Sequence, residues 1–209
     1  MSIVYTFPMT SPGGLRERKK KQTHQAIQSA ALDLFEERGF NNTTVDQIAA
    51  TANVSAMTFY RYFGTKEATV VEIFPVMDIM EPLPILIPAL SQGEAALETA
   101  LTEITNNVSG HWMSNLPRRI SLIHQYESLL HAAWSNWDVW VTTVTEKLPE
   151  ILGPDIVYYV RIITSCALQA MLDWGESPDF PSNDALIKRL AHALAIAAAP
   201  LPALDPLTA

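Results

Sequence analysis

The sequence predicts an all-α protein, and three observations support this fold class. Apolar residues recur every three or four positions through most of the 209 residues, as on the buried face of a helix. No stretch alternates apolar and polar residues as a half-buried strand does. A hydrophobic fraction of 48% is enough to bury a sizeable core. We expect about nine helices, in a small domain over 16–67 and a larger one over 68–199, with tails at 1–15 and 200–209.

The first helix is expected over 22–38. Its apolar residues share one face at helical spacing, and they are Ile27, Ala30, Ala31, Leu34 and Phe35. Gly39 then supplies the left-handed residue that commonly follows a helix C-terminus. This helix should hold the next two helices in place rather than contact a partner itself.

A pair of short helices joined by a tight turn follows. Thr44 is a favourable N-cap, and Gln47 completes a capping box for a helix over 45–52. Asn53 tolerates the left-handed conformation needed to end a helix in little space.

The second helix of the pair is expected over 56–63, with Ser55 as its N-cap and Gly64 at its end. Thr65 should open another helix that continues to about residue 77. Six residues have the spacing to form a shared core: Val45, Ile48, Ala49, Val54, Phe59 and Phe63. Five others are left for the exposed faces: Met57, Thr58, Tyr60, Arg61 and Tyr62. A helix-turn-helix places such a second helix in the major groove of DNA.

The remainder of the chain reads as helices separated by proline-rich interruptions. The apolar run over 83–90 lies among prolines and is expected to be a kinked helix or a loop packed under the core. Further helices are expected over 95–109, over 117–147 in one or two pieces opened by Pro117, over 156–174 after an Asp155 cap, and over 184–199 led by Asp184.

The charge is distributed unevenly. The whole chain has a formal net charge of −8, which alone would argue against a nucleic-acid partner. Residues 1–67, however, hold eight basic and six acidic residues, so the remainder carries −10. Five basic residues lie within six positions: Arg16, Arg18, Lys19, Lys20 and Lys21. A basic end on an acidic body would orient the chain on DNA. Alone, such a run is equally compatible with a solvated tail, but beside the helix-turn-helix a phosphate-contacting arm is favoured.

Residues 19–73 resemble the N-terminal domain of the TetR family of transcriptional regulators. The matching residues are Ala31-Leu32-Asp33-Leu34-Phe35, Gly39-Phe40, Thr43-Thr44-Val45, Ile48-Ala49, Val54-Ser55, Thr58-Phe59-Tyr60-Arg61-Tyr62-Phe63 and Lys66-Glu67. The resemblance covers about a quarter of the chain. Met57 departs from the glycine that many family members carry, so it does not indicate which bases are read.

The resemblance implies a set of DNA contacts. Thr44 and Tyr60 should bind phosphates, with help from Tyr62 and Lys66, and Thr44 could use its backbone N–H for this. Arg61 is the candidate for base readout, because a guanidinium matches the two acceptors of guanine. Thr58 and Met57 are candidates for contacts with bases or thymine methyl groups. For Tyr60 and Tyr62 the alternative is packing against neighbouring helices.

The two last helices are apolar on more than one face, which indicates burial on more than one face. In TetR-like proteins these helices pair with those of a second subunit. The resemblance therefore implies a homodimer that binds double-stranded operator DNA at a pseudo-palindrome. The alternative is that both helices pack only within their own domain.

Aromatic residues are abundant in the C-terminal half, with histidines among them. Together they favour a pocket for a ligand, for which Tyr126, His131, Trp134 and Trp137 are the candidate lining residues. Ordinary core packing is the alternative for each of them. Of the three tryptophans in this region, 134, 137 and 140, we expect two to point inward. His124, Glu127 and His131 have helical spacing on one face, but hydrogen bonding or solvation is favoured over a metal site, and no metal or cofactor is expected.

These observations favour a cytoplasmic, ligand-responsive transcriptional regulator, most simply a repressor. Arg118 to Trp174 resemble, more loosely, a TetR subfamily with members that sense acyl-coenzyme A, so the effector is expected to be a largely apolar, acyl-CoA-like small molecule. The alternatives are an activator of the same fold and an architectural DNA-binding protein. No nucleophile elbow or glycine-rich loop indicates an enzyme, and no segment reaches the length of a membrane span. The single Cys166 suits a reducing compartment. Residues 1–15 are expected to be a disordered tail, unless Met9 is the true start of the protein.

Overall fold

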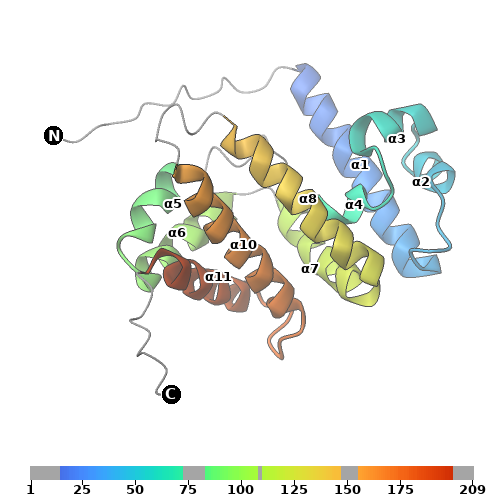
Figure 1. The fold of residues 1–209 in the computed structure, drawn as a ribbon. Helices are drawn as coiled ribbons and strands as arrows, with labels where there is room; N and C mark the ends of the chain where they lie inside the picture. The colour runs from blue at the N-terminus through green and yellow to red at the C-terminus, as the bar shows by residue number, and fades with distance from the viewer. Residues whose placement is uncertain (1–14, 73–82, 108–109, 147–154, 200–209) are drawn as a thin grey trace, which may run out of the picture. The chain divides into compact units, whose positions relative to one another are not determined.

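The computed structural model describes residues 15–72, 83–107, 110–146 and 155–199 (Figure 1). Within these ranges the chain forms ten helices and no strand, which confirms the all-α class. The helices are α1 (Leu15–Arg38), α2 (Val45–Thr51), α3 (Ala56–Phe63), α4 (Ala68–Val71), α5 (Leu83–Leu90), α6 (Glu94–Asn107), α7 (Gly110–Gln125), α8 (Glu127–Thr145), α10 (Ile156–Gly175) and α11 (Asn183–Ala198). They belong to two compact units, Met1–Thr69 and Val70–Ala209.

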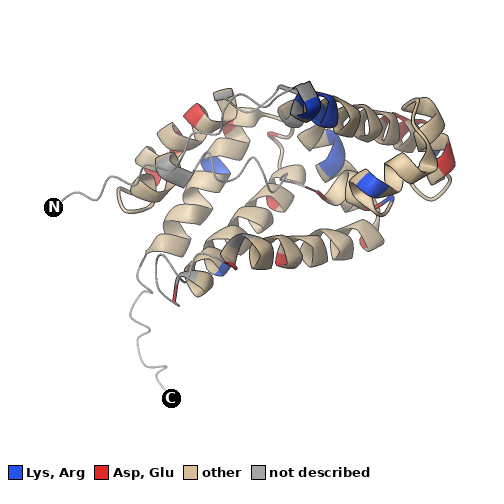
Figure 2. Cartoon of the chain, turned by 90° about the horizontal axis from the view of Figure 1, so that it is seen from above, with Lys and Arg blue, Asp and Glu red and all other residues tan. Residues whose placement is uncertain are grey.

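Helix α1 begins at Leu15 rather than at Gln22. The basic residues at 16 and 18–21 therefore lie on the first turns of a helix, where Figure 2 shows a concentration of Lys and Arg, and not on an extended arm. The expected tails fall outside the described residues, apart from Leu15.

The core of the first unit is built from the faces that the sequence predicted. The buried residues include Ile27, Ala30, Ala31, Leu32, Leu34, Phe35, Phe40, Ile48, Ala49, Phe59 and Phe63. Val45 and Val54, which were also expected in this core, are only half-buried. The rings of Phe35 and Phe40 meet edge to face with centroids 5.0 Å apart. Gly39 takes a positive φ of 84° and allows the chain to turn between them. The buried Thr43 hydroxyl donates to the carbonyls of Leu34 (3.3 Å) and Gly39 (2.9 Å), which ties the turn to the end of α1.

The second unit has two packed regions. In one, α6 and α11 face each other and α5 covers α6, around a core of Ala89, Leu97, Ala100, Leu101, Ala191 and Leu194. In the other, α7 and α8 pack against each other and against α10. The residues buried there include Leu116, Ile120, Ile123, Leu129, Ala133, Val141, Leu168, Met171 and Trp174. Helix α10 contributes to both regions, since it also packs along α11 (Figure 1).

Several helix boundaries differ from the sequence prediction. Pro117 lies inside α7 rather than at its start, and the interruption falls at Tyr126, which has an extended backbone (φ −130°, ψ 111°). The helix expected from Thr65 forms only over Ala68–Val71, and its expected end near residue 77 lies outside the described residues. Asp155 precedes α10 without a side-chain capping bond. Ser182 is the N-cap of α11, and its hydroxyl accepts from the backbone N–H of Ala185.

No helix in the described part of the chain is long and apolar enough to cross a membrane.

Candidate nucleic-acid interface

The turn between α2 and α3 is fixed by local hydrogen bonds. The Thr44 hydroxyl accepts from the Gln47 backbone N–H (3.3 Å), and the Gln47 side chain accepts from the Thr44 N–H (2.9 Å). This is the predicted capping box. Asn53 takes a positive φ of 54°, and the N–H of Val54 then donates to the carbonyl of Ala49 (2.9 Å). The turn is thereby closed on the end of α2.

Helix α3 is anchored on one face and exposed on the other. Phe59 and Phe63 are buried, and the ring of Phe63 also lies 4.3 Å from that of His24 on α1. On the opposite side Met57 is 78% exposed, Tyr60 is 54% exposed, and Arg61 is also exposed. An anchored helix that presents long polar and aromatic side chains to solvent has the form needed to enter a major groove.

The other two residues of α3 that are predicted to contact DNA, Thr58 and Tyr62, already interact with neighbouring side chains of the protein. Thr58 is half-buried, and its hydroxyl lies 3.0 Å from that of Ser55, whose side chain also caps the helix through the Thr58 N–H. Tyr62 is half-buried, and the guanidinium carbon of Arg61 lies 5.7 Å from the centre of its ring. This distance allows a cation–π interaction between the two neighbouring side chains.

The structure corrects the expected role of the Thr44 backbone. Its N–H is already taken by the Gln47 side chain and is therefore unsuited to bind a phosphate. The Thr44 side chain is exposed, and its hydroxyl accepts in the capping box, so the hydroxyl hydrogen remains to be donated. A phosphate contact by Thr44 would use that hydroxyl.

Lys66 has an intramolecular role that its sequence position did not reveal. Its ammonium donates to the carbonyls of Phe40 (2.7 Å) and Thr43 (3.0 Å) and lies 4.1 Å from the centre of the Phe40 ring. Burial lowers the pKa of Lys66 from 10.5, and the nearby carboxylate of Glu67 opposes this shift. An ammonium has three N–H donors, and two of them are used here. The phosphate contact of Lys66 remains a prediction that would depend on the third.

Helix α4 ends in three successive carbonyls that accept hydrogen bonds from distant side chains. Within the first unit, Gln28 Nε2 donates to the carbonyl of Thr69 (3.2 Å). Within the second unit, Arg119 Nε donates to Val70 (2.7 Å) and Asn136 Nδ2 to Val71 (3.2 Å). Sequence reasoning missed these contacts, because a polar residue within an apolar helix does not indicate which backbone group it meets.

The four predicted ligand residues are not equivalent in the structure. Tyr126 is half-buried at the break between α7 and α8, His131 is exposed, and Trp134 is 36% exposed. Trp137 is buried, and its ring stacks on that of Trp140 with centroids 4.9 Å apart. Two tryptophans therefore point inward, as expected, but the partner of Trp137 is Trp140 and not Trp134. A ligand site formed by the four predicted residues stays a prediction.

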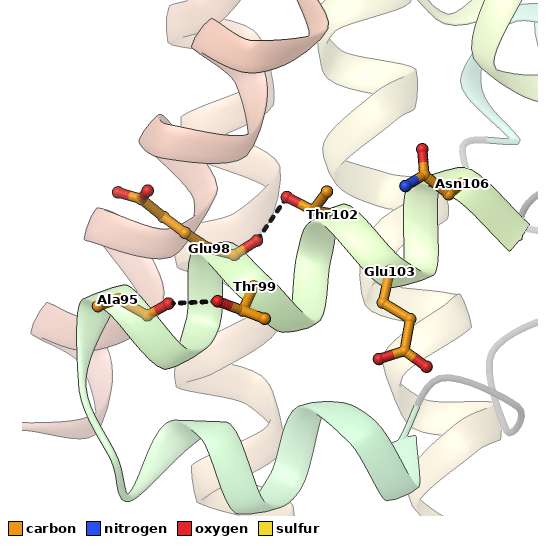
Figure 3. Close-up of a pocket in the computed structure, with 6 residues that line it drawn as sticks. All are labelled: Ala95, Glu98, Thr99, Thr102, Glu103 and Asn106. Carbon is orange, nitrogen blue, oxygen red and sulfur yellow. Dashed lines mark hydrogen bonds between the residues drawn. The ribbon is translucent and has the colours of Figure 1, made fainter.

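A shallow, open hollow lies elsewhere, along the surface of α6 (Figure 3). It is lined by Ala95, Glu98, Thr99, Thr102, Glu103 and Asn106. The hydroxyls of Thr99 and Thr102 donate to carbonyls one turn earlier in the same helix, at 3.0 and 2.7 Å. Since these hydroxyls serve their own helix and the hollow is open to solvent, it lacks the enclosed apolar character of a small-molecule site.

The histidine face considered for metal binding is divided by the break at Tyr126, so His124 lies on α7 and His131 on α8. His124 Nε2 donates to the carbonyl of Leu172 (2.9 Å), and its Nδ1 lies 3.3 Å from Glu176 Oε1. The described residues contain no cluster of metal-ligating side chains. His124 instead connects α7 to the end of α10.

The last helices expose apolar side chains. On α10, Tyr158, Tyr159 and Ile162 are 68%, 63% and 52% exposed, and on α11, Ile196 is 62% exposed. Ile163 and Leu190 pack against the core of the second unit instead. The four exposed residues lie on the two helices that are expected to pair with a second copy.

Comparison with known families and proteins gives several matches. The model of the family described as bacterial regulatory proteins, tetR family, matches residues 27–73. The chain is 36% identical over 85 residues to the HTH-type transcriptional regulator TcmR of Streptomyces glaucescens, which is 41% of this chain and 37% of that protein. It is 34% identical over 128 residues to the regulator HbdR of Aromatoleum, which is 61% of this chain and 40% of that protein. The aligned segments thus span well under half of either relative.

Among solved structures, the chain resembles NalD, the secondary repressor of the MexAB-OprM multidrug efflux pump in Pseudomonas aeruginosa. The sequence identity is 21%, the coverage is 83% of this chain and 95% of that chain, and the TM-score is 0.46. The family match, by contrast, falls on the helices that form the candidate interface, from Ile27 in α1 through α2 and α3 to the end of α4. Over residues 27–73 the chain is thus similar to the tetR family of bacterial regulatory proteins.

Proposed function

We propose that the protein is a homodimeric transcriptional regulator that binds operator DNA through α3 and acts as a repressor. The observation that carries this proposal is the two-sided character of α3. Its buried face, Phe59 and Phe63, fixes the helix on the core, and its exposed face presents Met57, Tyr60 and Arg61. The relatives TcmR and HbdR are described as HTH-type transcriptional regulators.

The contacts with DNA divide into two kinds. The Tyr60 and Thr44 hydroxyls, with Tyr62 and the third N–H of Lys66, are proposed to bind phosphates and to set the position of the domain on the duplex. Arg61 is proposed to donate to guanine in the major groove, with Met57 and Thr58 beside it. The basic first turns of α1 supply further positive charge near a polyanion.

The dimer is proposed to form through α10 and α11. Four large apolar side chains are more than half exposed there: Tyr158, Tyr159, Ile162 and Ile196. A two-fold symmetric dimer would bury the same surface on each subunit and present two copies of α3. The DNA site of such a dimer is a pseudo-palindrome.

The proposed signal is a largely apolar small molecule that binds in the second unit and lowers operator affinity. Linkage requires that this molecule bind the DNA-free state more tightly, and that DNA weaken its binding by the same factor. Tyr126, Trp137, Trp134 and His131 remain the proposed contacts. An acyl-CoA-like compound is one candidate effector. An activator would share every feature described, since the position of the operator relative to the promoter sets the sign of regulation.

Selection of binding sites from a random DNA library with the purified protein tests the proposed function. We expect enrichment of one two-fold symmetric sequence, with half-sites separated by about one helical turn or a multiple of it. Recovery of DNA without any sequence preference would contradict the proposal and favour an architectural DNA-binding protein. The Arg61→Ala variant is the control, because it should lose a preference at one position of each half-site.

A further inference from the structure

Arg119 is an ionisable side chain in an unusual environment. It lies on α7 and is 1% exposed, among the largest fully buried side chains of the described structure. Its neighbours one turn away on α7, Leu116 and Ile123, are buried as well, as is the adjacent Ile120. Burial lowers the pKa of Arg119 to about 10, opposed by the charge of Glu72, so the guanidinium is still a cation at neutral pH.

Most of the hydrogen-bonding capacity of Arg119 is not used by the described chain. Nε donates to the carbonyl of Val70, but neither Nη1 nor Nη2 has a hydrogen-bond acceptor, although both atoms are fully buried. The charge of Glu72 acts on Arg119 without a hydrogen bond to either nitrogen. A buried cation with unsatisfied donors costs stability, and native proteins usually pair such groups.

Arg161 shows how an arginine elsewhere in the same unit is satisfied. Its Nη1 donates to Asp138 at 2.5 Å and its Nη2 donates to the Thr142 hydroxyl at 3.0 Å. The two terminal nitrogens thus meet oxygen acceptors, and the side chain is 41% exposed. Arg119 is more deeply buried than Arg161, so its charge costs more free energy, and its terminal nitrogens have no acceptor. A purely structural role therefore does not explain why these nitrogens are unpaired.

We propose that Arg119 is the receptor for a carboxylate group of the small-molecule effector, bound through Nη1 and Nη2. The edge formed by these two nitrogens donates two parallel hydrogen bonds, a geometry that matches the two oxygens of a carboxylate. Because Nε is already bound to Val70, this edge can be occupied without breaking the bond to α4. The inference rests on the proposed function for the existence of an effector and adds the chemistry of its polar group.

The surroundings select the remainder of the ligand. Leu116, Ile120 and Ile123 on α7 are apolar, so a ligand anchored at Arg119 should carry an apolar body. A single guanidinium matches the single negative charge of a carboxylate better than the higher charge of a phosphate. The neighbouring Arg118 is directed elsewhere, since its Nη1 donates to Asn115 Oδ1 at 3.4 Å. An aliphatic monocarboxylate is therefore the ligand class that we propose.

Binding of decanoate and of decanol to the full-length protein, without DNA, tests this inference. The two probes share an alkyl chain and differ in the group that Arg119 would bind. Calorimetry, supported by tryptophan fluorescence, should show saturable binding of decanoate that is at least about tenfold tighter than binding of decanol. Arg119→Met should remove this difference, and Arg119→Lys should retain only part of it. Arg161→Met, which removes an exposed arginine of the same unit, should leave the difference intact.

Three outcomes would overturn the inference: equal affinity for both probes, no saturable binding of decanoate, or a preference for decanoate that survives in Arg119→Met. Thermal melting with and without decanoate provides a second readout. Decanoate should raise the melting temperature of the wild type but not that of Arg119→Met, and an equal rise in both proteins would contradict the inference. Since this experiment contains no DNA, its failure would leave the proposed DNA binding untouched. A protein that binds decanoate but no operator DNA would refute only the proposed DNA binding.

Discussion

The Nε of Arg119 donates a 2.7 Å hydrogen bond to the carbonyl of Val70, which joins a buried side chain of α7 to the last turn of α4. Asn136 of α8 makes the equivalent contact with the next carbonyl, Val71. In the preceding unit, Gln28 of α1 binds the carbonyl of Thr69. Helix α4 is only four residues long and crosses the boundary between the two units, so these side chains, rather than helix propensity, hold its end.

The contact of Asn136 with Val71 should matter for the stability of α4. Asn136→Leu removes the donor and leaves the Val71 carbonyl without it, which we expect to cost about 1 kcal/mol of unfolding free energy. Hydrogen exchange should become faster at the amides of the α4 region, with little change in α11. Thr143→Ala on the exposed side of α8 is the control, because its hydroxyl serves only its own helix. Unchanged exchange at α4 in Asn136→Leu would contradict this role.

Arg61→Ala should weaken operator binding by about 1–3 kcal/mol and relax discrimination at one base position. The reason is the loss of two hydrogen bonds to one guanine, while Phe59 and Phe63 keep α3 in place. Affinity measurements on the selected operator and on its single-base variants check both effects. Arg189, half-buried on α11, is not expected to contact DNA, so Arg189→Ala serves as the control. Equal loss of affinity for every sequence would mean that Arg61 binds phosphate instead.

Lys66→Met should destabilise the first unit by about 1–2 kcal/mol, because it removes the ammonium that binds the carbonyls of Phe40 and Thr43. Burial lowers the pKa of Lys66 in the folded state because it disfavours the charged ammonium. This desolvation cost to the folded wild type is fully present below the folded-state pKa and is relieved only as the pH rises from that pKa toward 10.5. The difference in unfolding free energy between wild type and variant should therefore be constant between about pH 6 and 8. Denaturant titrations at several pH values measure it, and a variant as stable as the wild type would exclude this role.

The helix-turn-helix could be predicted in detail because its signals are local. The Thr44–Gln47 capping box, the positive φ of Asn53 and the Ser55 cap each depend on residues within about one helical turn of each other, and all are confirmed. The burial of Phe59 and Phe63 follows from helical spacing alone. The predicted roles in DNA binding are a separate matter and remain to be tested.

Contacts between distant residues could not be predicted in the same way. Lys66 meets a carbonyl 26 positions away and Arg119 one that is 49 positions away, so the partner of each depends on the packing of whole helices. Pro117 was expected to open a helix, because proline is favoured in a first turn, yet it lies inside α7. The spacing of the three tryptophans of α8 predicted that two rings would point inward, but it did not predict which two. Spacing alone does not fix the rotation of a helix about its axis.

Gly175→Ala should destabilise the packing of α10 on α7. A Cβ at this position would lie 2.3 Å from Ile120 Cγ2 and 2.8 Å from two atoms of the His124 ring, which is held by its bond to the carbonyl of Leu172. We expect a loss of about 1–3 kcal/mol, because neither neighbour can move without disturbing a buried contact. Thermal and denaturant unfolding measure the loss. Glu176→Ala is the control, since it removes only the exposed partner of His124; equal stability of Gly175→Ala and wild type would show that the helices can separate freely there.

Ile162→Glu should convert the proposed dimer into a folded monomer. Ile162 is 52% exposed on α10, so a charge there should be tolerated within the subunit and should prevent burial of the same position against a second copy. Sedimentation or light scattering at micromolar concentration should report half the wild-type mass, with an unchanged helical circular dichroism spectrum. Operator affinity should fall by at least about tenfold, because the two copies of α3 would no longer be held together. Val139→Glu is the matched control: Val139 is 63% exposed on α8, outside the proposed interface. If the wild type is itself a stable monomer, or if Ile162→Glu remains dimeric, the surface formed by α10 and α11 is not the interface.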